Sequence, residues 1–473
     1  MKRFPLRAAA AALALALLSG CGQSVPASPV SLTVWTYYNG DQLTAFNGLV
    51  DLFNQTVGTE QGIYVESSSY GSVEDLQDSV LSAAAQEPGA RNMPNIFAAY
   101  ADTAYALDQM GQVVDLQNYL TQEELDQYVD SYLTEGSFSG DGSIQIFPTA
   151  KSTELLLLNA TDWAPFAQAT GATLEQLSTM EGLVETAEAY YNWTDSATPA
   201  PNDGKAFFGW DAMANYMLVG AMQMGTEIFS VSQGHMTLHF PKETARRLWE
   251  NFYVPFVKGY FEASGRFRSD GVKTGAIISF VGSSSGATFF PTQVIVNDTE
   301  SYPIEMQVLP VPRFRGGEAV AVQQGAGMVV TKGSEEEIRA SVEFLKWFTS
   351  PEHNITFSVE SGYLPVTKAG SQMDAILASG VEINGVMEQI LTVAVDTVNQ
   401  QRLYTPKAFP GGTDARAILE HTLRDRATAD REVVLEGLAQ GQGLEEAAAP
   451  FVSDASFEAW YQTLLAQLQP FAG

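Results

Sequence analysis

Residues 334–352 read SEEEIRASVEFLKWFTSPE, and residues 361–368 read SGYLPVTK. The first stretch predicts a helix, because Ser334 and Glu337 fit a capping box, in which each side chain satisfies a backbone amide at the helix start. Its apolar residues recur at the spacing of one helix face and predict packing on a core: Ile338, Val342, Leu345 and Phe348. Pro351 predicts the end of this helix, because proline lacks the amide donor that a helix interior needs.

Proline interrupts three extended stretches of the chain, which are Phe147-Pro148, Leu309-Pro310-Val311-Pro312 and Leu364-Pro365. Proline also holds the residue before it in an extended conformation, so a strand that contains proline tends to leave its sheet there. Each stretch is therefore either a crossing between two domains or an ordinary strand end. Proline alone does not decide between these two interpretations.

From residue 31 onward, short apolar or alternating runs are interleaved with segments of helical period. This order predicts an α/β protein with largely parallel sheets. Strands are expected at residues 31–38, 62–67, 95–100, 144–148, 154–159, 275–281, 304–311 and 327–331. Thr121 and Glu124 fit a second capping box and predict another helix start. The length of the chain favours two or three domains.

The first twenty residues have the layout of a secretory signal. Three basic residues, the last of them Arg7, precede an apolar run over residues 8–18 that is too short to span a bilayer. The sequence Leu18-Ser19-Gly20-Cys21 that follows resembles the lipobox of bacterial lipoproteins. We therefore expect residues 1–20 to be removed and Cys21 to carry lipid.

Cys21 is the only cysteine of the chain, so no disulfide can form within a monomer. A lone cysteine can also be a buried structural thiol, but its place at the end of a signal segment favours the anchor. Lipid chains would bury methylene groups at about 0.8 kcal/mol each and hold the protein on the extracytoplasmic face of the cell membrane. Residues 21–30 are expected to form a flexible tether. The sequence does not distinguish a host with one membrane from a host with two.

The chain is strongly acidic, with 55 acidic residues, 25 basic residues and a net charge of −30. Loss of residues 1–20 removes three basic residues and no acidic residue, which makes the net charge −33. Such a charge repels the phosphates of nucleic acids and disfavours docking on anionic lipid headgroups. The 45% of hydrophobic residues is nevertheless enough for a large core, unlike the composition of an acidic disordered protein. We therefore expect no nucleic acid partner and a membrane contact through Cys21 alone.

The order of segments resembles the family 1 extracellular solute-binding proteins, whose best known members bind maltodextrins or glycerol-3-phosphate. The most specific matches are Lys346-Trp347-Phe348 through Ser350-Pro351-Glu352, followed by residues 361–368. Residues 148–159 and 275–286 resemble two further segments of the family. The resemblance implies a type II periplasmic-binding-protein fold, in which two lobes with mixed sheets are joined by a three-segment hinge and close on a ligand.

The resemblance also implies a domain division. One lobe would contain residues 31–147 plus 311–363, the other would contain residues 152–308 plus 367–473, and the hinge would lie near residues 148–151, 309–312 and 364–366. The implied function is the solute-binding lipoprotein of an ABC transporter. It would act as a monomer that delivers a small solute, such as a sugar or polyol, to the transmembrane subunits of a permease.

Ligands of open α/β sheets gather beyond the carboxyl ends of the strands, so the residues just after each predicted strand or crossing are candidates for ligand binding. They are Tyr37, Tyr38, Tyr100, Asp102, Ser152, Thr153, Trp210, Asp211, Ser284, Ser285, Gly325 and Tyr363. Sugars present an apolar face and a rim of hydroxyls, which aromatic rings and polar side chains can cover together. Each candidate has an alternative role as a packed aromatic or as a solvated loop residue.

The glycerol-phosphate-binding members imply ligand contacts at positions that match Asp102, Ser152 or Thr153, Trp210, Ser284 or Ser285, Gly325 and Tyr363 here. Those members also hold the phosphate with a basic residue in a late loop. This chain reads Phe409-Pro410-Gly411-Gly412 there, and Arg402 and Lys407 do not align with that basic residue. We therefore expect a neutral carbohydrate rather than a phosphate ester.

Single motifs of the sequence are compatible with enzymes. Residues 282–286 match the Gly-x-Ser-x-Gly elbow of serine hydrolases, but the residues after them are a poor helix start. A zinc enzyme needs three or four ligands in close array, and His235 and His239 have no third histidine nearby. A lipid-anchored glycosidase needs only two carboxylates and stays open as an alternative, as does a receptor lipoprotein that uses the same cleft without transport. The resemblance favours a binding protein with no catalytic residue, cofactor or metal.

The substitution Cys21→Ser is expected to yield a protein without lipid, because serine offers no thiol for the modification. Metabolic labelling with a radioactive fatty acid checks this expectation in the producing bacterium. The wild type and the tether variant Ser24→Ala should both be labelled. Label that remains on the Cys21→Ser protein would contradict the anchor assignment.

Overall fold

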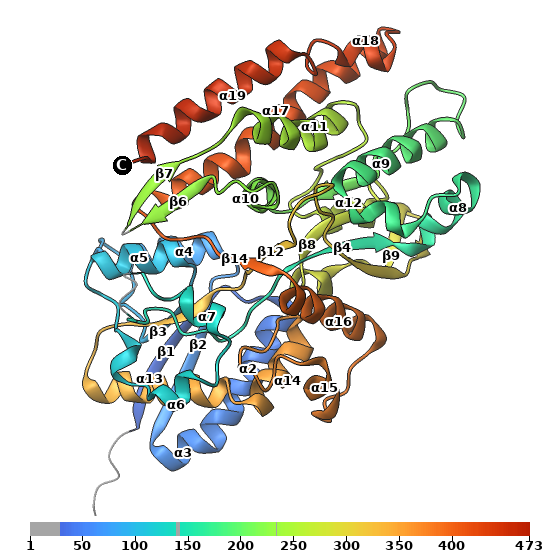
Figure 1. Ribbon diagram of the computed structural model, residues 1–473. Helices are drawn as coiled ribbons and strands as arrows, with labels where there is room; N and C mark the ends of the chain where they lie inside the picture. The colour runs from blue at the N-terminus through green and yellow to red at the C-terminus, as the bar shows by residue number, and fades with distance from the viewer. Residues whose placement is uncertain (1–28, 139–141, 233) are drawn as a thin grey trace, which may run out of the picture.

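The computed structural model describes residues 29–138, 142–232 and 234–473, which form two α/β lobes (Figure 1). The expected signal segment and Cys21 lie outside the described residues. In the described part of the chain, no helix is long and apolar enough to cross a membrane. The expectation of a two-lobed fold with mixed sheets is confirmed.

The sheet of the first lobe has the strand order β13-β3-β1-β2. Its strands are β1 (Val30–Thr36), β2 (Ile63–Ser69), β3 (Ile96–Ala99) and β13 (Gly327–Val330). β1 runs parallel to both of its neighbours, and β13 runs antiparallel to β3. All residues of β3 and β13 are buried, as expected for strands with helices on both faces.

Five long helices pack around this sheet, and three short ones connect them. The long helices are α2 (Gly40–Gln55), α4 (Val73–Ala84), α5 (Ala101–Gln109), α13 (Glu335–Phe348) and α14 (Pro351–Ser361). The short ones are α3 (Val57–Gln61), α6 (Gln122–Leu125) and α7 (Asp130–Thr134). Both predicted capping boxes are present, at the starts of α6 and α13, and the predicted apolar face of α13 is buried. Pro351 begins α14 instead of ending α13, because the first position of a helix tolerates proline.

The sheet of the second lobe has the strand order β11-β4-β8-β5. Its strands are β4 (Glu154–Asn159), β5 (Phe208–Trp210), β8 (Ser279–Ser283) and β11 (Met306–Pro310). β4 runs antiparallel to β11 and to β8, and only β5 and β8 are parallel. The expectation of largely parallel sheets is therefore wrong for this lobe. β4 leads the chain away from the hinge and β11 leads it back, so these two neighbours run in opposite directions.

Long helices surround the second sheet and include most of the C-terminal third of the chain (Figure 1). They are α8 (Ala160–Thr170), α9 (Met180–Asp195), α10 (Met213–Gln223), α11 (Lys242–Val257), α16 (Gly385–Gln400), α17 (Gly412–Ala439) and α19 (Asp454–Leu468), with the shorter α12 (Arg268–Thr274), α15 (Met373–Ala378) and α18 (Leu444–Ala448). Trp249 of α11 stacks on Tyr253 with ring centroids 3.5 Å apart and contacts Trp460 of α19. These aromatic contacts attach the C-terminal helices to the lobe.

Several short strands lie outside the predictions. They are β6 (Phe229–Ser232) with β7 (His235–Leu238), β9 (Gln293–Asn297) with β10 (Glu300–Pro303), and β12 (Val320–Val322) with β14 (Arg402–Tyr404). The expected strand at residues 144–148 is not formed, and a single bridge joins Phe147 to Met328. The expected strand 154–159 is present as β4 with the expected ends, and the other expected strands are present with shifted ends. The expected strand 275–281, for example, is β8, which begins four residues later.

The crossings between the lobes lie side by side. The backbone of Lys151 pairs with Leu364, and the backbone of Ser152 pairs with Gln324. Val322 belongs to the apolar cluster of the second lobe, whereas Ala326 belongs to that of the first. We therefore propose that the middle crossing lies at residues 323–325 and that residues 311–322 belong to the second lobe.

A buried ion pair lies where these crossings meet. The Lys151 ammonium pairs with Glu135, at the end of α7, and the two side chains are only 1% and 4% exposed. Lys151 Nζ also donates to the carbonyl of Gly325 at 2.8 Å. Gln323 Nε2 donates to Glu135 Oε2 at 2.8 Å. The pair thus joins the first lobe to the first and middle crossings.

Lys151→Met should lower the free energy of unfolding by about 3–5 kcal/mol, because Glu135 would remain buried without its counter-charge. Lys151→Met combined with Glu135→Leu should cost less than the two single variants added together. Chemical denaturation of the four proteins measures this difference. The exposed pair of Lys368 and Asp130 is the control, and Lys368→Met should cost less than about 1 kcal/mol. Full additivity of the two buried substitutions would contradict the assigned role of the pair.

Candidate functional site

Four predicted tyrosines come together in the first lobe, as part of its apolar cluster or packed against it. Tyr37 and Tyr38 follow β1, Tyr100 follows β3, and Tyr363 follows α14. The hydroxyls of Tyr37 and Tyr363 share a hydrogen bond at 3.2 Å, and the ring of Tyr38 lies 5.2 Å from that of Tyr37 and 5.9 Å from that of Tyr363. Burial raises the pKa of all four phenols, so they remain neutral hydroxyls that can both donate and accept.

Gly325 lies beside these tyrosines in the middle crossing. Its φ is +88°, and a Cβ there would lie 2.6 Å from the carbonyl oxygen of Ala150, so this position requires glycine. The amide of the next residue, Ala326, donates to the hydroxyl of Tyr37 at 3.4 Å. Gly325, predicted as a ligand residue, therefore lies next to the tyrosine that its neighbouring amide contacts, and its role in ligand binding stays a prediction.

The predicted residues Ser152 and Thr153 take part in the crossings. The backbone of Ser152 pairs with Gln324, and the Thr153 hydroxyl donates to the carbonyl of Val322 at 2.8 Å. Both side chains are buried. The Thr153 hydroxyl therefore holds the hinge together rather than facing a ligand.

The second lobe contributes Trp210 and a chain of three polar side chains. Asn215 Nδ2, in α10, donates to Glu154 Oε1 at 3.0 Å. Arg416 Nη2, in α17, donates to Asn215 Oδ1 at 2.5 Å. Burial raises the pKa of Glu154 to about 7, against the opposing influence of Asn215, Trp210 and Arg416. Trp210 Nε1 itself makes no hydrogen bond of normal geometry.

Asp102 of the first lobe meets α17 of the second. It lies in the first turn of α5, and a Cβ on Gly412 would lie 2.5 Å from its Oδ1. Burial raises the pKa of Asp102 to about 6, and the positive charge of Arg416 opposes this shift. The carboxylate and the guanidinium therefore influence each other across the two lobes.

Ser284 and Ser285 follow β8 and face the first lobe. Gln42 Nε2, in α2, donates to the carbonyl of Ser285 at 3.3 Å across the lobes. The hydroxyl of Ser285 is close enough to Tyr363 to oppose the burial-driven rise of the pKa of that phenol. The Ser284 hydroxyl is buried and has no hydrogen-bond partner in the protein.

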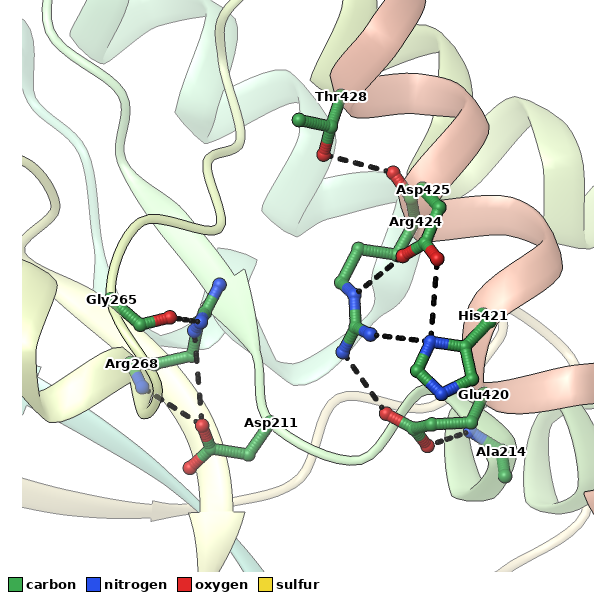
Figure 2. Close-up of polar contacts among 9 residues, drawn as sticks. All are labelled: Asp211, Ala214, Gly265, Arg268, Glu420, His421, Arg424, Asp425 and Thr428. Carbon is green, nitrogen blue, oxygen red and sulfur yellow. Dashed lines mark hydrogen bonds and ion pairs between the residues drawn. The ribbon is translucent and has the colours of Figure 1, made fainter. Parts of the chain in front are cut away.

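Asp211 follows the same strand as Trp210, but its carboxylate is engaged elsewhere (Figure 2). Its Oδ1 accepts from the backbone amide of Arg268 at 2.8 Å and lies 3.8 Å from Nε of that guanidinium. Nearby, Glu420 of α17 accepts from the amide of Ala214 at 2.9 Å, in the first turn of α10. Asp211 thus holds the start of α12. Its carboxylate contacts Arg268 and not the tyrosines, and its predicted role as a ligand residue stays a prediction.

Sequence reasoning missed Glu154, Asn215 and Arg416. Glu154 begins β4 and Asn215 lies within α10, so neither follows a strand. Arg416 lies four residues beyond Gly412, one helical turn into α17. A search for a basic residue along the helix after the late loop, and not only within the loop, would have found Arg416.

Several buried polar atoms at this junction lack a hydrogen-bond partner in the protein. They are the acceptor Asp102 Oδ1, the donor Arg416 Nη1 and the hydroxyl oxygen of Ser284. Buried polar atoms are normally paired, so these three mark positions where a bound molecule can hydrogen-bond.

The lobes are close together in this structure. Small cavities of about 10–20 Å³ lie beside Tyr37, beside Trp210 and beside Asp102. Sites for small molecules usually have volumes of about 300–1,000 Å³. A ligand therefore requires the lobes to separate before it can enter between them.

Comparison with solved structures shows the same fold in bacterial binding proteins. The cyclic α-maltosyl-1,6-maltose binding protein of Arthrobacter globiformis is 18% identical, with a TM-score of 0.64 over 93% of this chain and 100% of that one. UgpB of Mycobacterium tuberculosis, solved with glycerophosphocholine, is 18% identical, with a TM-score of 0.65 over 93% and 98% of the two chains. MalE of Bdellovibrio bacteriovorus, bound to maltotriose, is 13% identical, with a TM-score of 0.63 over 92% and 100%.

No curated protein sequence matches the chain. The model of one protein family matches residues 48–380, which include most of both lobes. The predicted resemblance is confirmed by this match: the chain belongs to the bacterial extracellular solute-binding proteins.

Proposed function

We propose that this solute-binding protein captures a neutral carbohydrate between its lobes and delivers it to the permease of an ABC importer. The observation that carries the proposal is that both a buried acceptor and a buried donor lack partners close to aromatic rings. Asp102 Oδ1 needs a donor, whereas Arg416 Nη1 needs an acceptor. A sugar hydroxyl both donates and accepts, and the flat face of a sugar covers an aromatic ring.

A phosphate or carboxylate ligand fits this set of atoms less well. Such a group only accepts hydrogen bonds and cannot pair with Asp102 Oδ1, and repulsion by an ionised Asp102 or Glu154 would oppose its attraction to Arg416. The similar structures named for a cyclic maltosyl-maltose and for maltotriose support a carbohydrate, and the structure with glycerophosphocholine supplies the appropriate phosphate control.

The proposed location is the outer face of the cell membrane, which agrees with membership of an extracellular family. Lipid on Cys21 would hold the protein there, and the tether over residues 21–30 would let it reach the permease. A monomer suffices for this role, because both walls of the cleft come from one chain. No cofactor or metal is required for binding.

A second candidate is a glycosidase, and one observation favours it. Asp102 and Glu154 are two buried carboxyl groups that both interact with Arg416, and burial raises their pKa values to about 6 and about 7. Glycosidases use such a pair as acid and as base or nucleophile. Overnight incubation of the protein with each oligosaccharide, followed by chromatography for shorter products, distinguishes the two candidates.

A thermal-shift screen of the domain without its signal tests the proposed ligand class against mono- and oligosaccharides, glycerophosphocholine and peptides. A ligand at a hundredfold excess over its Kd should stabilise the protein by about 2.7 kcal/mol. We expect this stabilisation from a neutral sugar. Stabilisation by glycerophosphocholine alone would contradict the carbohydrate assignment.

Trp210→Ala should weaken binding of that sugar at least about tenfold, because the ring covers the apolar face of the sugar. Calorimetric titration measures the affinity. Trp347→Ala is the matched control, since Trp347 stacks on His353 at 3.8 Å in the first lobe, away from the site. Small-angle scattering of the wild type should also show a smaller radius of gyration with sugar. An unchanged radius of gyration at saturating sugar would contradict the proposed closing of the lobes.

Sugar affinity should decrease as the pH falls through about 6, because a protonated Asp102 loses a lone pair that accepts from a sugar hydroxyl. Asp102→Asn should remove this pH dependence. The raised pKa has the opposite consequence for the empty protein, whose stability from this group is highest below the unfolded pKa of about 3.9 and is lost as the pH rises through about 6. Titrations at pH 5, 6, 7 and 8 measure the binding part, and equal affinities at all four values would exclude Asp102 as a ligand acceptor.

A further inference from the structure

Arg416 is an unusual buried arginine. Its Nη2 donates to the neutral amide oxygen of Asn215 at 2.5 Å, and its Nη1 is buried without a partner. None of the ion pairs among the described residues includes Arg416. Where an arginine pairs with a carboxylate, the contact is frequently a fork that occupies two of the three guanidinium nitrogens. Here one terminal nitrogen is held and the other stays free.

The amide of Asn215 is fixed in one orientation. Asn215 is fully buried in the first turn of α10, and its Nδ2 donates to Glu154 Oε1 at 3.0 Å. A flipped amide would place a donor against the donors of Arg416 and an acceptor against the oxygen of Glu154. Glu154 thus determines that the oxygen of the Asn215 amide, and not its nitrogen, points at the guanidinium.

Two contacts hold α17 against the first turn of α10. Arg416 donates to Asn215. One helical turn later, Glu420 accepts from the amide of Ala214 at 2.9 Å, a contact drawn in Figure 2. Residues four apart lie on the same face of a helix, so both contacts come from one face of α17. The backbone contact fixes the helix, and the Asn215 contact then fixes the end of the Arg416 side chain.

We propose that Asn215 is a positioning residue for ligand recognition, which aims Arg416 Nη1 at the solute, and that Glu154 sets the orientation of Asn215. The role as a whole rests on the proposed binding function. The amide carries no charge, so the full charge of the guanidinium remains available to the solute and to Asp102. A carboxylate at position 215 would neutralise that charge.

Glu154 needs only an acceptor oxygen for this role. Its pKa is raised to about 7 by burial, so it is partly protonated at neutral pH, and an unprotonated oxygen still accepts from Asn215. Glutamine also has an acceptor oxygen and a similar shape. The hydrogen bonds from Arg416 to Asn215 and from Asn215 to Glu154 form a relay. Glu154→Gln should therefore preserve the relay, whereas Glu154→Leu should abolish it.

The first measurement needs no ligand. In wild-type protein with ¹⁵N-labelled arginine, the Arg416 guanidinium should rotate slowly and give separate Nη signals in NMR spectra, because Asn215 holds one terminal nitrogen. Asn215→Leu and Glu154→Leu should merge these signals, and Glu154→Gln should retain them. Separate signals in Asn215→Leu would overturn the proposed relay. Asn215→Ala, which removes the same amide, replaces Asn215→Leu if that variant does not fold.

The second measurement is calorimetric titration with the neutral sugar that stabilises the wild type, or with maltotriose as the first probe. Asn215→Leu should lower the affinity at least tenfold, and Glu154→Gln should retain it within threefold. Asn251→Leu is the matched control, because Asn251 is also a buried helical asparagine, donating to the carbonyl of Arg247 at 2.9 Å in α11. Wild-type affinity in Asn215→Leu would overturn the role in recognition. If no sugar binds the wild type, the proposed function fails, while the NMR result still decides on the relay.

Discussion

The arrangement of the two lobes depends on the buried ion pair of Lys151 and Glu135. Removal of two charges from water is costly, and the mutual attraction compensates only when further hydrogen bonds satisfy the remaining atoms. Here those bonds come from the carbonyl of Gly325 and the amide of Gln323, both in the middle crossing. The backbone of Lys151 also pairs with Leu364 of the last crossing. The charges are therefore compensated only when the first and middle crossings are in place, and the backbone of the last crossing is attached to the first at Lys151.

This junction also forms the floor of the cleft. Lys151 Nζ donates to the carbonyl of Gly325, and Gly325 lies so close to Ala150 that a side chain there would clash. These two contacts restrict the backbone conformation of the middle crossing. Tyr37 lies directly above it, hydrogen-bonded to the next amide. The floor is thus set by the hinge, whereas the walls that carry Asp102 and Arg416 belong to separate lobes. In the proposed closing mechanism, the distance between the walls changes while the contacts of the floor stay intact.

Site residues could be selected from the sequence where a local pattern, such as the end of a strand, has a fixed place in the fold. The rule that ligand sites of α/β sheets lie at the carboxyl ends of strands selected Tyr37 and Tyr100, which follow β1 and β3, and Trp210, which ends β5. The same rule selected Asp211, which Arg268 engages from 57 residues away, and no local pattern indicates such a contact. Arg416 was missed because its position depends on how α17 packs on α10. Short strands such as β12 and β14 were missed because three residues carry too little pattern to predict pairing between distant segments.

The unpaired atoms explain how a ligand can favour the closed form. A buried donor or acceptor without a partner costs about 1–3 kcal/mol, because its hydrogen bonds to water are not replaced by hydrogen bonds within the protein. With the lobes together, this cost applies to Asp102 Oδ1 in the first lobe and to Arg416 Nη1 in the second. Separation of the lobes returns both atoms to water, so the empty protein gains by opening. A solute that pairs with both atoms removes the cost only in the closed form, and such a difference in affinity between two states is what shifts an equilibrium. The polar atoms that the fold leaves unpaired therefore make closure depend on the solute.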